Sequence, residues 1–249
     1  MPTVPSVPRS DVQLRERLLD ATETQLVDSD DDDIATRAVC DAAGVSQPVL
    51  YRLFVDKRGL LEAVVERGYD RYVLDKETQQ RTADPVADLR AGWVHHMAFA
   101  EGHPAVYRLM FAPHPAGRPS ARRRILDLLV EALQRVAAIG RLAVRPQVAA
   151  QAILSGNVGV ALNRIAQPEL YSDPQLSLRV RDAIFASLII DATTEVGAGS
   201  GGLNPAVSPT LATTAIALSA QLGEHPPTTL VPEELALLSR WLDRLSAPE

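Results

Sequence analysis

The sequence predicts an all-α fold in which a small N-terminal three-helix domain precedes a larger helical domain. Apolar residues recur at helical spacing along most of the 249 residues, and no segment shows the alternation and hairpin turns typical of strands. Hydrophobic residues make up 46% of the chain and aromatic residues only 4%, so the core depends on Leu, Val, Ile and Ala. Proline and glycine separate the periodic segments and mark their ends.

The composition also excludes several classes of protein. A single cysteine, Cys40, excludes an internal disulfide framework and a cysteine-based zinc site. The stretch from Met1 to Ser10 has no apolar centre of the kind found in signal peptides, and no apolar run is long enough to span a membrane. We therefore expect a cytoplasmic protein that makes no use of the membrane.

The small domain is expected at residues 11–58, after a flexible tail at 1–10. Its first helix, 11–27, carries apolar residues on one face. An acidic turn follows, and a second helix at 34–42 can be capped by Asp33 or Thr36. Although the net charge of the chain is −6, residues 34–60 contain four basic and two acidic side chains, which leaves this segment weakly basic.

A tight turn leads from the second helix to the third. Gly44 suits the end of a helix because it tolerates positive φ. Ser46 is expected to cap the third helix by accepting a hydrogen bond from the Val49 N–H, and Pro48 fits the first turn. The third helix should end near Phe54, and a fourth, 57–76, should connect the domains after a cap at Asp56.

The larger domain is expected at residues 77–249. Its helices are separated by proline and glycine, and a Gly/Pro-rich loop interrupts them at 197–209. The predicted helices span 85–101, 104–111, 120–142, 146–165, 174–195, 210–222 and 232–246.

The segment from Ala38 to Phe54 has the features of a helix-turn-helix, in which two short helices meet at a tight turn that contains glycine. Small residues in its first helix allow the helices to cross closely, and Val45 fills the angle between them. Leu50 and Phe54, four residues apart, can bury the back of the second helix. The residues left to face outward are Gln47, Val49, Tyr51 and Arg52.

From about Leu18 to Val65 the sequence resembles the TetR family. The likeness rests on Ala43-Gly44-Val45-Ser46, Leu50-Tyr51, Phe54, Lys57 and Leu60 at their spacing. A weaker likeness to the effector domains of one TetR subgroup covers Trp93 to Met110, with His103-Pro104 and Tyr107.

This resemblance implies that the third helix enters the major groove of double-stranded operator DNA. Ser46, Gln47, Tyr51 and Lys57 would contact DNA, with Tyr51 and Lys57 mainly on phosphates. The candidates for base edges are Gln47, Val49 and Arg52, which suit adenine, a thymine methyl and guanine respectively. One departure from the family pattern is the run Asp30–Asp33, which should repel phosphate wherever it approaches DNA.

A small apolar effector is expected to bind in the larger domain, because its few large side chains gather with some polar ones. The candidate lining residues are Trp93, His96, Met97, Tyr107, Met110, Phe111, Asn157 and Asn163. The alternative is that these aromatic residues are simply core. His95, His96 and His103 lie close in sequence, but their spacing is not that of metal ligands, so no metal is expected.

Small residues form a stripe along two predicted helices of the larger domain. They are Ala149, Ala152, Ser155, Gly156, Gly159, Val160 and Asn163, followed by Ala183, Ser187, Ile190 and Thr194. Small residues let helices approach closely, and the resemblance implies that the corresponding helices pair in a homodimer. Two-fold symmetry also matches DNA half-sites about one helical turn apart.

Taken together, the expected function is a ligand-responsive transcriptional regulator, a repressor that its effector releases from a palindromic operator. The alternative is a helical enzyme or a small-molecule-binding protein in which the helix-turn-helix is only structural. No nucleophile elbow, phosphate loop or dinucleotide fingerprint supports catalysis, so we expect neither enzymatic activity nor a cofactor.

Overall fold

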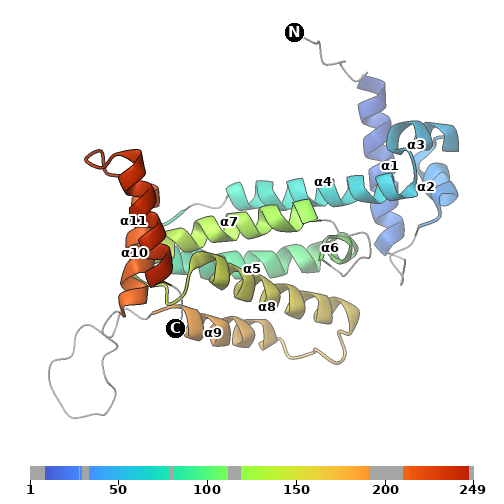
Figure 1. The fold of residues 1–249 in the computed structure, drawn as a ribbon. Coiled ribbons are helices and arrows are strands. Elements are labelled where there is room, and N and C mark those ends of the chain that lie inside the picture. Colours follow the sequence, from blue (N-terminus) through green and yellow to red (C-terminus); the bar gives the residue numbers. More distant parts are fainter. Residues whose placement is uncertain are drawn as a thin grey trace, which may run out of the picture. The chain divides into compact units, whose positions relative to one another are not determined.

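The computed structural model describes residues 9–27, 29, 34–78, 81–111, 119–190 and 210–246, and over these residues it is all-α (Figure 1). The described helices are α1 (Arg9–Val27), α2 (Thr36–Ala43), α3 (Gln47–Phe54), α4 (Lys57–Glu77), α5 (Pro85–Gly102), α6 (Pro104–Phe111), α7 (Pro119–Ala138), α8 (Pro146–Ala166), α9 (Leu176–Leu188), α10 (Leu211–Glu224) and α11 (Pro232–Leu245). None of them combines the length and apolarity needed to cross a membrane.

The predicted fold class and the order of the helices are confirmed, but two helices are shorter than predicted. Helix α7 ends at Ala138 rather than at 142, and α9 ends at Leu188 rather than at 195. The segments that follow them pair with each other: the Ala143 N–H donates to the Leu188 carbonyl at 2.8 Å, and the Ile190 N–H donates to the Arg141 carbonyl at 3.1 Å. Helix α7 itself ends in a glycine cap, because Gly140 adopts φ 73° and the Arg141 N–H donates to the Val136 carbonyl at 3.2 Å. Helix α9 ends where its last residues pair with the segment after α7, which helical periodicity does not reveal.

The chain divides into two compact units. The first unit contains Met1–Gln80 and Ala98–Arg123, and the second contains Arg81–Met97 and Arg124–Glu249. The sequence-based boundary at residue 77 follows the motif, whereas the compact units divide α5 between Met97 and Ala98. The reason is that α6, which follows α5, packs against α1 and α4.

In the first unit, α1 contacts α2, α3, α4 and α6, and α4 contacts α3 and α6. One core joins these helices, because each supplies a residue of at most 4% exposure; they are Leu18, Val39, Leu50, Phe54, Leu60, Val64 and Tyr107. The helix-turn-helix is thus held from behind by α1 and α4.

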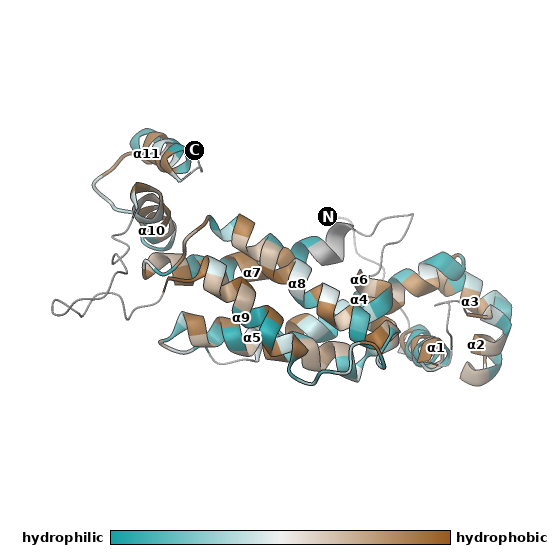
Figure 2. Cartoon of the chain, turned by 90° about the horizontal axis from the view of Figure 1, so that it is seen from below, coloured by the Kyte–Doolittle hydropathy of each residue, from teal (hydrophilic) through white to brown (hydrophobic). Residues whose placement is uncertain are grey.

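In the second unit, α8 packs along α9, and α10 packs along α11 (Figure 1). The buried residues include Trp93, Leu133, Ala149, Ile153 and Phe185. Helix α11 is amphipathic, with hydrophilic and hydrophobic residues on different sides (Figure 2). Its predicted position is confirmed to within one residue.

A polar cluster fixes the start of α5 to α7 within the second unit. The Asp88 carboxylate accepts hydrogen bonds from the Thr82 hydroxyl at 2.6 Å and from Arg135 Nη1 at 2.9 Å. Arg135 Nη2 also donates to the Thr82 carbonyl at 2.8 Å. Burial raises the pKa of Asp88, but the hydrogen bonds from Thr82 and Arg135 outweigh it, so this pKa lies below its usual value.

Candidate nucleic-acid interface and buried polar site

The turn between α2 and α3 has the geometry that the sequence predicted. Gly44 caps α2 in the left-handed region at φ 65°, and the Val45 N–H donates to the Cys40 carbonyl at 3.0 Å. Val39, Cys40 and Ala43 are buried on α2, and Leu50 and Phe54 are buried on α3. Because each helix turns its apolar face inward, the opposite face of α3 remains open.

The exposed face of α3 carries most of the predicted DNA-contacting residues. Ser46, Gln47, Tyr51 and Arg52 are exposed, with 44% of Tyr51 accessible, while Val49 and Lys57 are half-buried. Because Tyr51 is not buried, the fold forgoes the hydrophobic free energy that packing its ring would contribute. The arrangement therefore presents polar and aromatic side chains outward from α3.

Two predicted helix caps are corrected by the structure. Ser46 is the N-cap of α3, but its side chain makes no capping hydrogen bond; the Val49 N–H donates to the Ser46 backbone carbonyl at 3.0 Å instead. The N-cap of α2 is Ala35, also without a side-chain cap, because Thr36 lies inside the helix. Asp33, the other predicted cap, lies outside the described residues, as does the rest of the Asp30–Asp33 run.

The turn from α3 to α4 is tight and places Lys57 at a helix N-terminus. The Asp56 side chain caps α4 by accepting from the Gly59 N–H at 2.7 Å, as predicted. Val55 adopts φ 68°, which a β-branched residue rarely does, and 81% of it is exposed. A Cβ at Gly59 would collide with the Phe54 carbonyl oxygen, so this close approach requires glycine.

Arg52, a candidate for base contact, is paired with an acidic residue that sequence reasoning missed. Its Nη1 and Nη2 atoms each lie 2.8 Å from an oxygen of Asp11, at the start of α1. The hydrogen bonds from Arg52 hold the pKa of Asp11 below its usual value. Arg15, one turn further along α1, places its guanidinium 4.7 Å from the centre of the Phe54 ring. No local sequence signal joins residues 41 positions apart.

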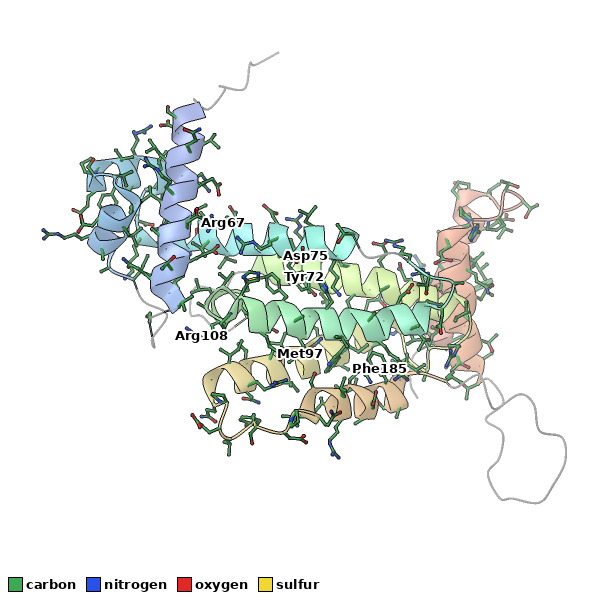
Figure 3. The ribbon with its side chains drawn as sticks, turned by 180° about the vertical axis from the view of Figure 1, so that it is seen from behind. Arg67, Tyr72, Asp75, Met97, Arg108 and Phe185 are labelled. Atoms are coloured by element: carbon green, nitrogen blue, oxygen red, sulfur yellow. The ribbon has the colours of Figure 1, made fainter. Side chains whose placement is uncertain are left out.

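Behind this face, Arg67 of α4 joins α4 to α1 through acidic side chains (Figure 3). Its guanidinium lies 2.7 Å from both Asp20 and Glu23 and 3.1 Å from Glu16. Arg71, one turn further on, also contacts Glu23, at 3.4 Å. The acidic side chains of α1 thus serve as partners for α4, a role that the charge pattern of α1 alone did not suggest.

The second unit buries several polar side chains, some of them among the predicted effector-binding residues. Trp93 is 2% exposed, and its Nε1 donates to the Ser177 hydroxyl at 2.9 Å. His96, Met97 and Asn157 are also buried. The Oδ1 atom of Asn157 has no hydrogen-bond partner among the described residues. A buried carbonyl oxygen without a donor costs free energy unless a bound molecule supplies one.

Four further residues were predicted to line the effector pocket. Tyr107, Met110 and Phe111 are buried in the first unit, where the Tyr107 and Phe111 rings lie 4.5 Å apart. Asn163 is exposed on α8. Ser177, which sequence reasoning did not select, contacts Trp93 from 84 positions away.

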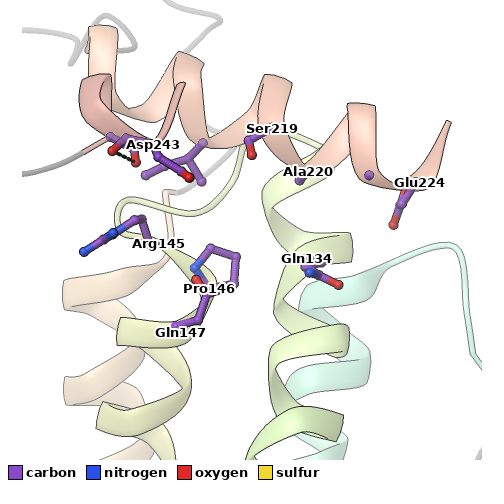
Figure 4. A pocket seen from close by; sticks show the side chains of 11 residues that line it. Gln134, Arg145, Pro146, Gln147, Ser219, Ala220, Glu224 and Asp243 are labelled. Atoms are coloured by element: carbon purple, nitrogen blue, oxygen red, sulfur yellow. Dashed lines mark hydrogen bonds between the residues drawn. The ribbon is translucent and has the colours of Figure 1, made fainter. Parts of the chain in front are cut away.

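A surface groove lies at another place in the second unit (Figure 4). It has a volume of about 200 Å³ and is formed by α7, the start of α8, α10 and α11; its lining includes Gln134, Arg145, Gln147, Ile216, Glu224 and Asp243. Apart from buried Ile216, these residues are exposed, and they include both acidic and basic groups. None of the predicted effector-binding residues lines this groove.

The small-residue stripe of α8 and α9 is partly open to solvent. Ala152, Ser155 and Asn163 are exposed on α8, and Ala183, Ala186 and Ser187 are exposed on α9. Gly159 has open space where a Cβ would stand. Ala149, Val160 and half-buried Gly156 face the interior more than predicted, and Thr194 lies outside the described residues.

Cys40 and His103 occupy packing positions. Cys40 is 2% exposed, and burial, followed by the nearby Asp41, raises the pKa of its thiol. The His103 ring lies 5.1 Å from that of Phe99, and burial lowers its pKa. Within the described residues, no three histidine, cysteine or acidic side chains gather as metal ligands would.

A helix-turn-helix with an outward-facing second helix and a supporting first helix defines a class of DNA-binding regulatory proteins. Residues 18–64 match the bacterial regulatory proteins of the tetR family. This match covers the helix-turn-helix and leaves the rest of the chain outside it. Among curated proteins, no sequence matches the chain.

Solved structures with the same fold include regulators from several bacteria. SmeT, the repressor of the Stenotrophomonas maltophilia multidrug efflux pump SmeDEF, is 24% identical with a TM-score of 0.59, and the match covers 76% of this chain and 97% of SmeT. A Rhodococcus protein of unknown function is 23% identical with a TM-score of 0.61, covering 71% and 96%. The Streptomyces fradiae regulator TylP is 18% identical with a TM-score of 0.55, covering 74% and 90%. SmeT has also been solved in complex with triclosan.

Proposed function

We propose that this protein is a homodimeric repressor that leaves its operator when a small apolar effector binds. The observation that carries this proposal is the open face of α3, with exposed Gln47, Tyr51 and Arg52 opposite buried Leu50 and Phe54. A helix-turn-helix that was only structural would gain by packing that face, so its exposure favours a macromolecular partner.

The chemistry of the open face suits duplex DNA. Tyr51 and Lys57 can hold phosphates, and the dipole at the N-terminus of α4 favours anions. Gln47 and Val49 can approach base edges, where glutamine pairs with adenine and valine contacts a thymine methyl. Phosphate contacts would fix the register of α3, and the base contacts would select the sequence.

Dimerisation would place two such faces on one duplex. We assign the interface to the small residues of α8 and α9, led by exposed Ser155 and Ala183 and half-buried Gly159, because they allow close helix approach. A Ser155→Arg variant should be monomeric in sedimentation analysis and should lose at least about tenfold in operator affinity. Ala91→Arg, at an exposed alanine of α5, is the control. A Ser155→Arg protein that remains dimeric would remove α8 from the interface.

The effector is proposed to bind beside Trp93, His96, Met97 and Asn157. These residues combine apolar surface with one buried oxygen that lacks a donor, so a small apolar molecule with a hydroxyl or N–H group fits their chemistry. The triclosan complex of SmeT shows that a protein of this fold binds a compound of this kind. Reciprocal coupling requires that such a molecule and DNA weaken each other's binding by the same factor.

DNA binding is tested first, with the full chain and the duplex upstream of its own gene. Tyr51→Ala combined with Lys57→Ala should weaken binding by about tenfold or more, since each change removes a phosphate contact. Arg240→Ala, at an exposed residue of α11, is the control. Binding that is absent in the unmodified protein, or indifferent to the double change, rejects the proposed function.

Effector binding is tested by thermal shift with a panel of small phenolic compounds, triclosan among them. A compound that binds the folded state raises its melting temperature. The same compound should lower operator affinity in a titration. If compounds that stabilise the protein leave operator affinity unchanged, the chain is not a ligand-released repressor.

A further inference from the structure

The ion pair between Arg52 and Asp11 lies at the edge of the exposed face of α3, and the sequence did not predict it. Both nitrogens at the end of the guanidinium, Nη1 and Nη2, donate to the two carboxylate oxygens at 2.8 Å. This end-on arrangement occupies two of the five N–H groups of the arginine. No partner among the described residues takes up the side edge formed by the Nε–H and the adjacent Nη2–H.

The two partners differ in exposure. The side chain of Asp11 is 17% exposed, whereas that of Arg52 is 54% exposed. The pair therefore presents the arginine outward and keeps the carboxylate behind it. Asp11 lies in the first turn of α1, where the helix dipole stabilises a negative charge. The carboxylate thus has two reasons to stay ionised and in place.

A second contact keeps the α1 end of this pair fixed relative to α3. Arg15 packs its guanidinium over the ring of Phe54, which is 4% exposed. Asp11 and Arg15 are one helical turn apart on α1, and Arg52 and Phe54 lie at the end of α3. The first turns of α1 therefore hold the last turn of α3 at two points.

We propose that Asp11 is a positioning residue that holds Arg52 so that its free edge reads a guanine in the major groove. Guanine O6 and N7 accept two parallel hydrogen bonds from an arginine. An unheld arginine loses several rotamer degrees of freedom when it makes them, and Asp11 imposes much of that order beforehand. This inference rests on the proposed DNA-binding function and adds a specificity-determining residue to it.

The opposite role for Asp11 would be to sequester Arg52. In that case Arg52 would have to leave the carboxylate before touching DNA, and neutralising Asp11 would strengthen binding to every sequence alike. Positioning predicts a different pattern. Neutralising Asp11 would reduce the preference for guanine, whatever happens to overall affinity.

The experiment uses the full chain and a library of random-sequence duplexes. The unmodified protein selects its preferred site, and affinities are then measured for that duplex and for versions in which each G·C pair is replaced in turn. We expect one position in each half-site at which replacing guanine costs roughly 5- to 150-fold. In Asp11→Asn this preference should fall by about tenfold or to none, while affinity for random duplex is kept or increased.

Three further variants separate the causes. Arg52→Lys keeps the charge but loses the paired N–H groups, so it should lose the same guanine preference. Asp41→Asn, at an exposed residue of α2, makes the same charge change away from Arg52 and should keep the preference. Helical content and melting temperature are compared for all variants. If Asp11→Asn does not fold, Arg52→Lys still tests whether Arg52 selects guanine, and a guanine preference that it keeps would overturn the proposal.

The outcomes distinguish the two proposals. If the unmodified protein selects no sequence, the DNA-binding function itself fails. If it selects a site but Asp11→Asn keeps the guanine preference, DNA binding stands and the positioning role of Asp11 is overturned. Equal tightening on all duplexes with the preference intact also overturns it, in favour of sequestration.

Discussion

The predicted DNA-facing side chains stand on α3 and the start of α4, whereas the buried polar side chains of the second unit come from α5, α8 and α9. Arg52 and Asp11, at the α3 face, meet in an exposed ion pair. Trp93 and Ser177 meet inside the protein, and Asn157, also buried in the second unit, keeps an oxygen without a partner among the described residues.

This difference indicates how each region would serve the proposed function. The side chains of the α3 face are exposed, and a packed core holds the helix behind them, so this face would contact DNA without rearrangement. The second unit encloses its polar groups, so a molecule that binds there must replace contacts or fill space in the interior.

The largest effect is expected from Leu50→Ala, which removes the side chain that anchors α3 to the core. Leu50 is fully buried, and a large-to-small change at such a site costs about 2–5 kcal/mol in the free energy of unfolding. Denaturant titration measures the loss, and operator binding should weaken in parallel. Leu237→Ala, at a residue 44% exposed, is the control; an equal loss there would show that Leu50 is not special.

Gly59→Ala tests the tight turn that orients α3 against α4. The new Cβ would meet the Phe54 carbonyl oxygen, and such overpacking costs about 1–3 kcal/mol. Gly223→Ala in α10, where nothing lies within 4 Å of an added Cβ, should stabilise the helix by about 0.5–1 kcal/mol. The melting temperatures of both variants test this prediction. An unchanged melting temperature for Gly59→Ala would contradict the close contact between Gly59 and the Phe54 carbonyl oxygen.

Asn157→Leu should stabilise the second unit while abolishing the effector response. Replacing a buried oxygen that lacks a donor by an apolar side chain removes a penalty of about 1–3 kcal/mol, less any cost of the slightly larger side chain. The melting temperature should rise, and the compounds that stabilise the unmodified protein should no longer do so. If the variant is destabilised and still responds to effector, Asn157 is not part of the effector site. Asn163→Leu, at the exposed asparagine of α8, is the matched control.

The smallest effect is expected from Asp88→Asn and depends on pH. Because the pKa of folded Asp88 lies below its usual value, its contribution to stability is present at neutral pH. It is lost as pH falls below about 4, where the carboxyl of the unfolded chain takes up a proton. At pH 7 the variant should lose below about 1 kcal/mol, and the difference should vanish in acid. Asp127→Asn, at an exposed residue of α7, is the control for removing one carboxylate.

Sequence reasoning predicted local features well and long-range contacts poorly. Gly44, Asp56 and the burial of Leu50 and Phe54 followed from spacing and turn chemistry, and the structure confirms each. The Ser46 cap was wrong because the backbone carbonyl, not the hydroxyl, accepts from Val49. The end of α7 was wrong because a glycine cap at Gly140 stops that helix, and the end of α9 was wrong because pairing with a distant segment replaces helical hydrogen bonds.

The predicted effector-binding residues illustrate the same limit. The sequence predicted that Trp93, Tyr107 and Asn163 line one pocket, because they are large or polar side chains within apolar helices. The structure places Trp93 and Tyr107 in different compact units and leaves Asn163 exposed. Residue type indicates what a side chain can do, but only packing decides which side chains share a site.

The sequence by itself determined the all-α class, the helix-turn-helix and the open face of α3, because each depends on the period of one helix or on the chemistry of one turn. The tertiary structure decided which residue pairs with Arg52, how Arg67 contacts the acidic side chains of α1, and that Asn157 is buried. These features join helices that are far apart along the chain, and apolar burial brings them together without leaving a local pattern.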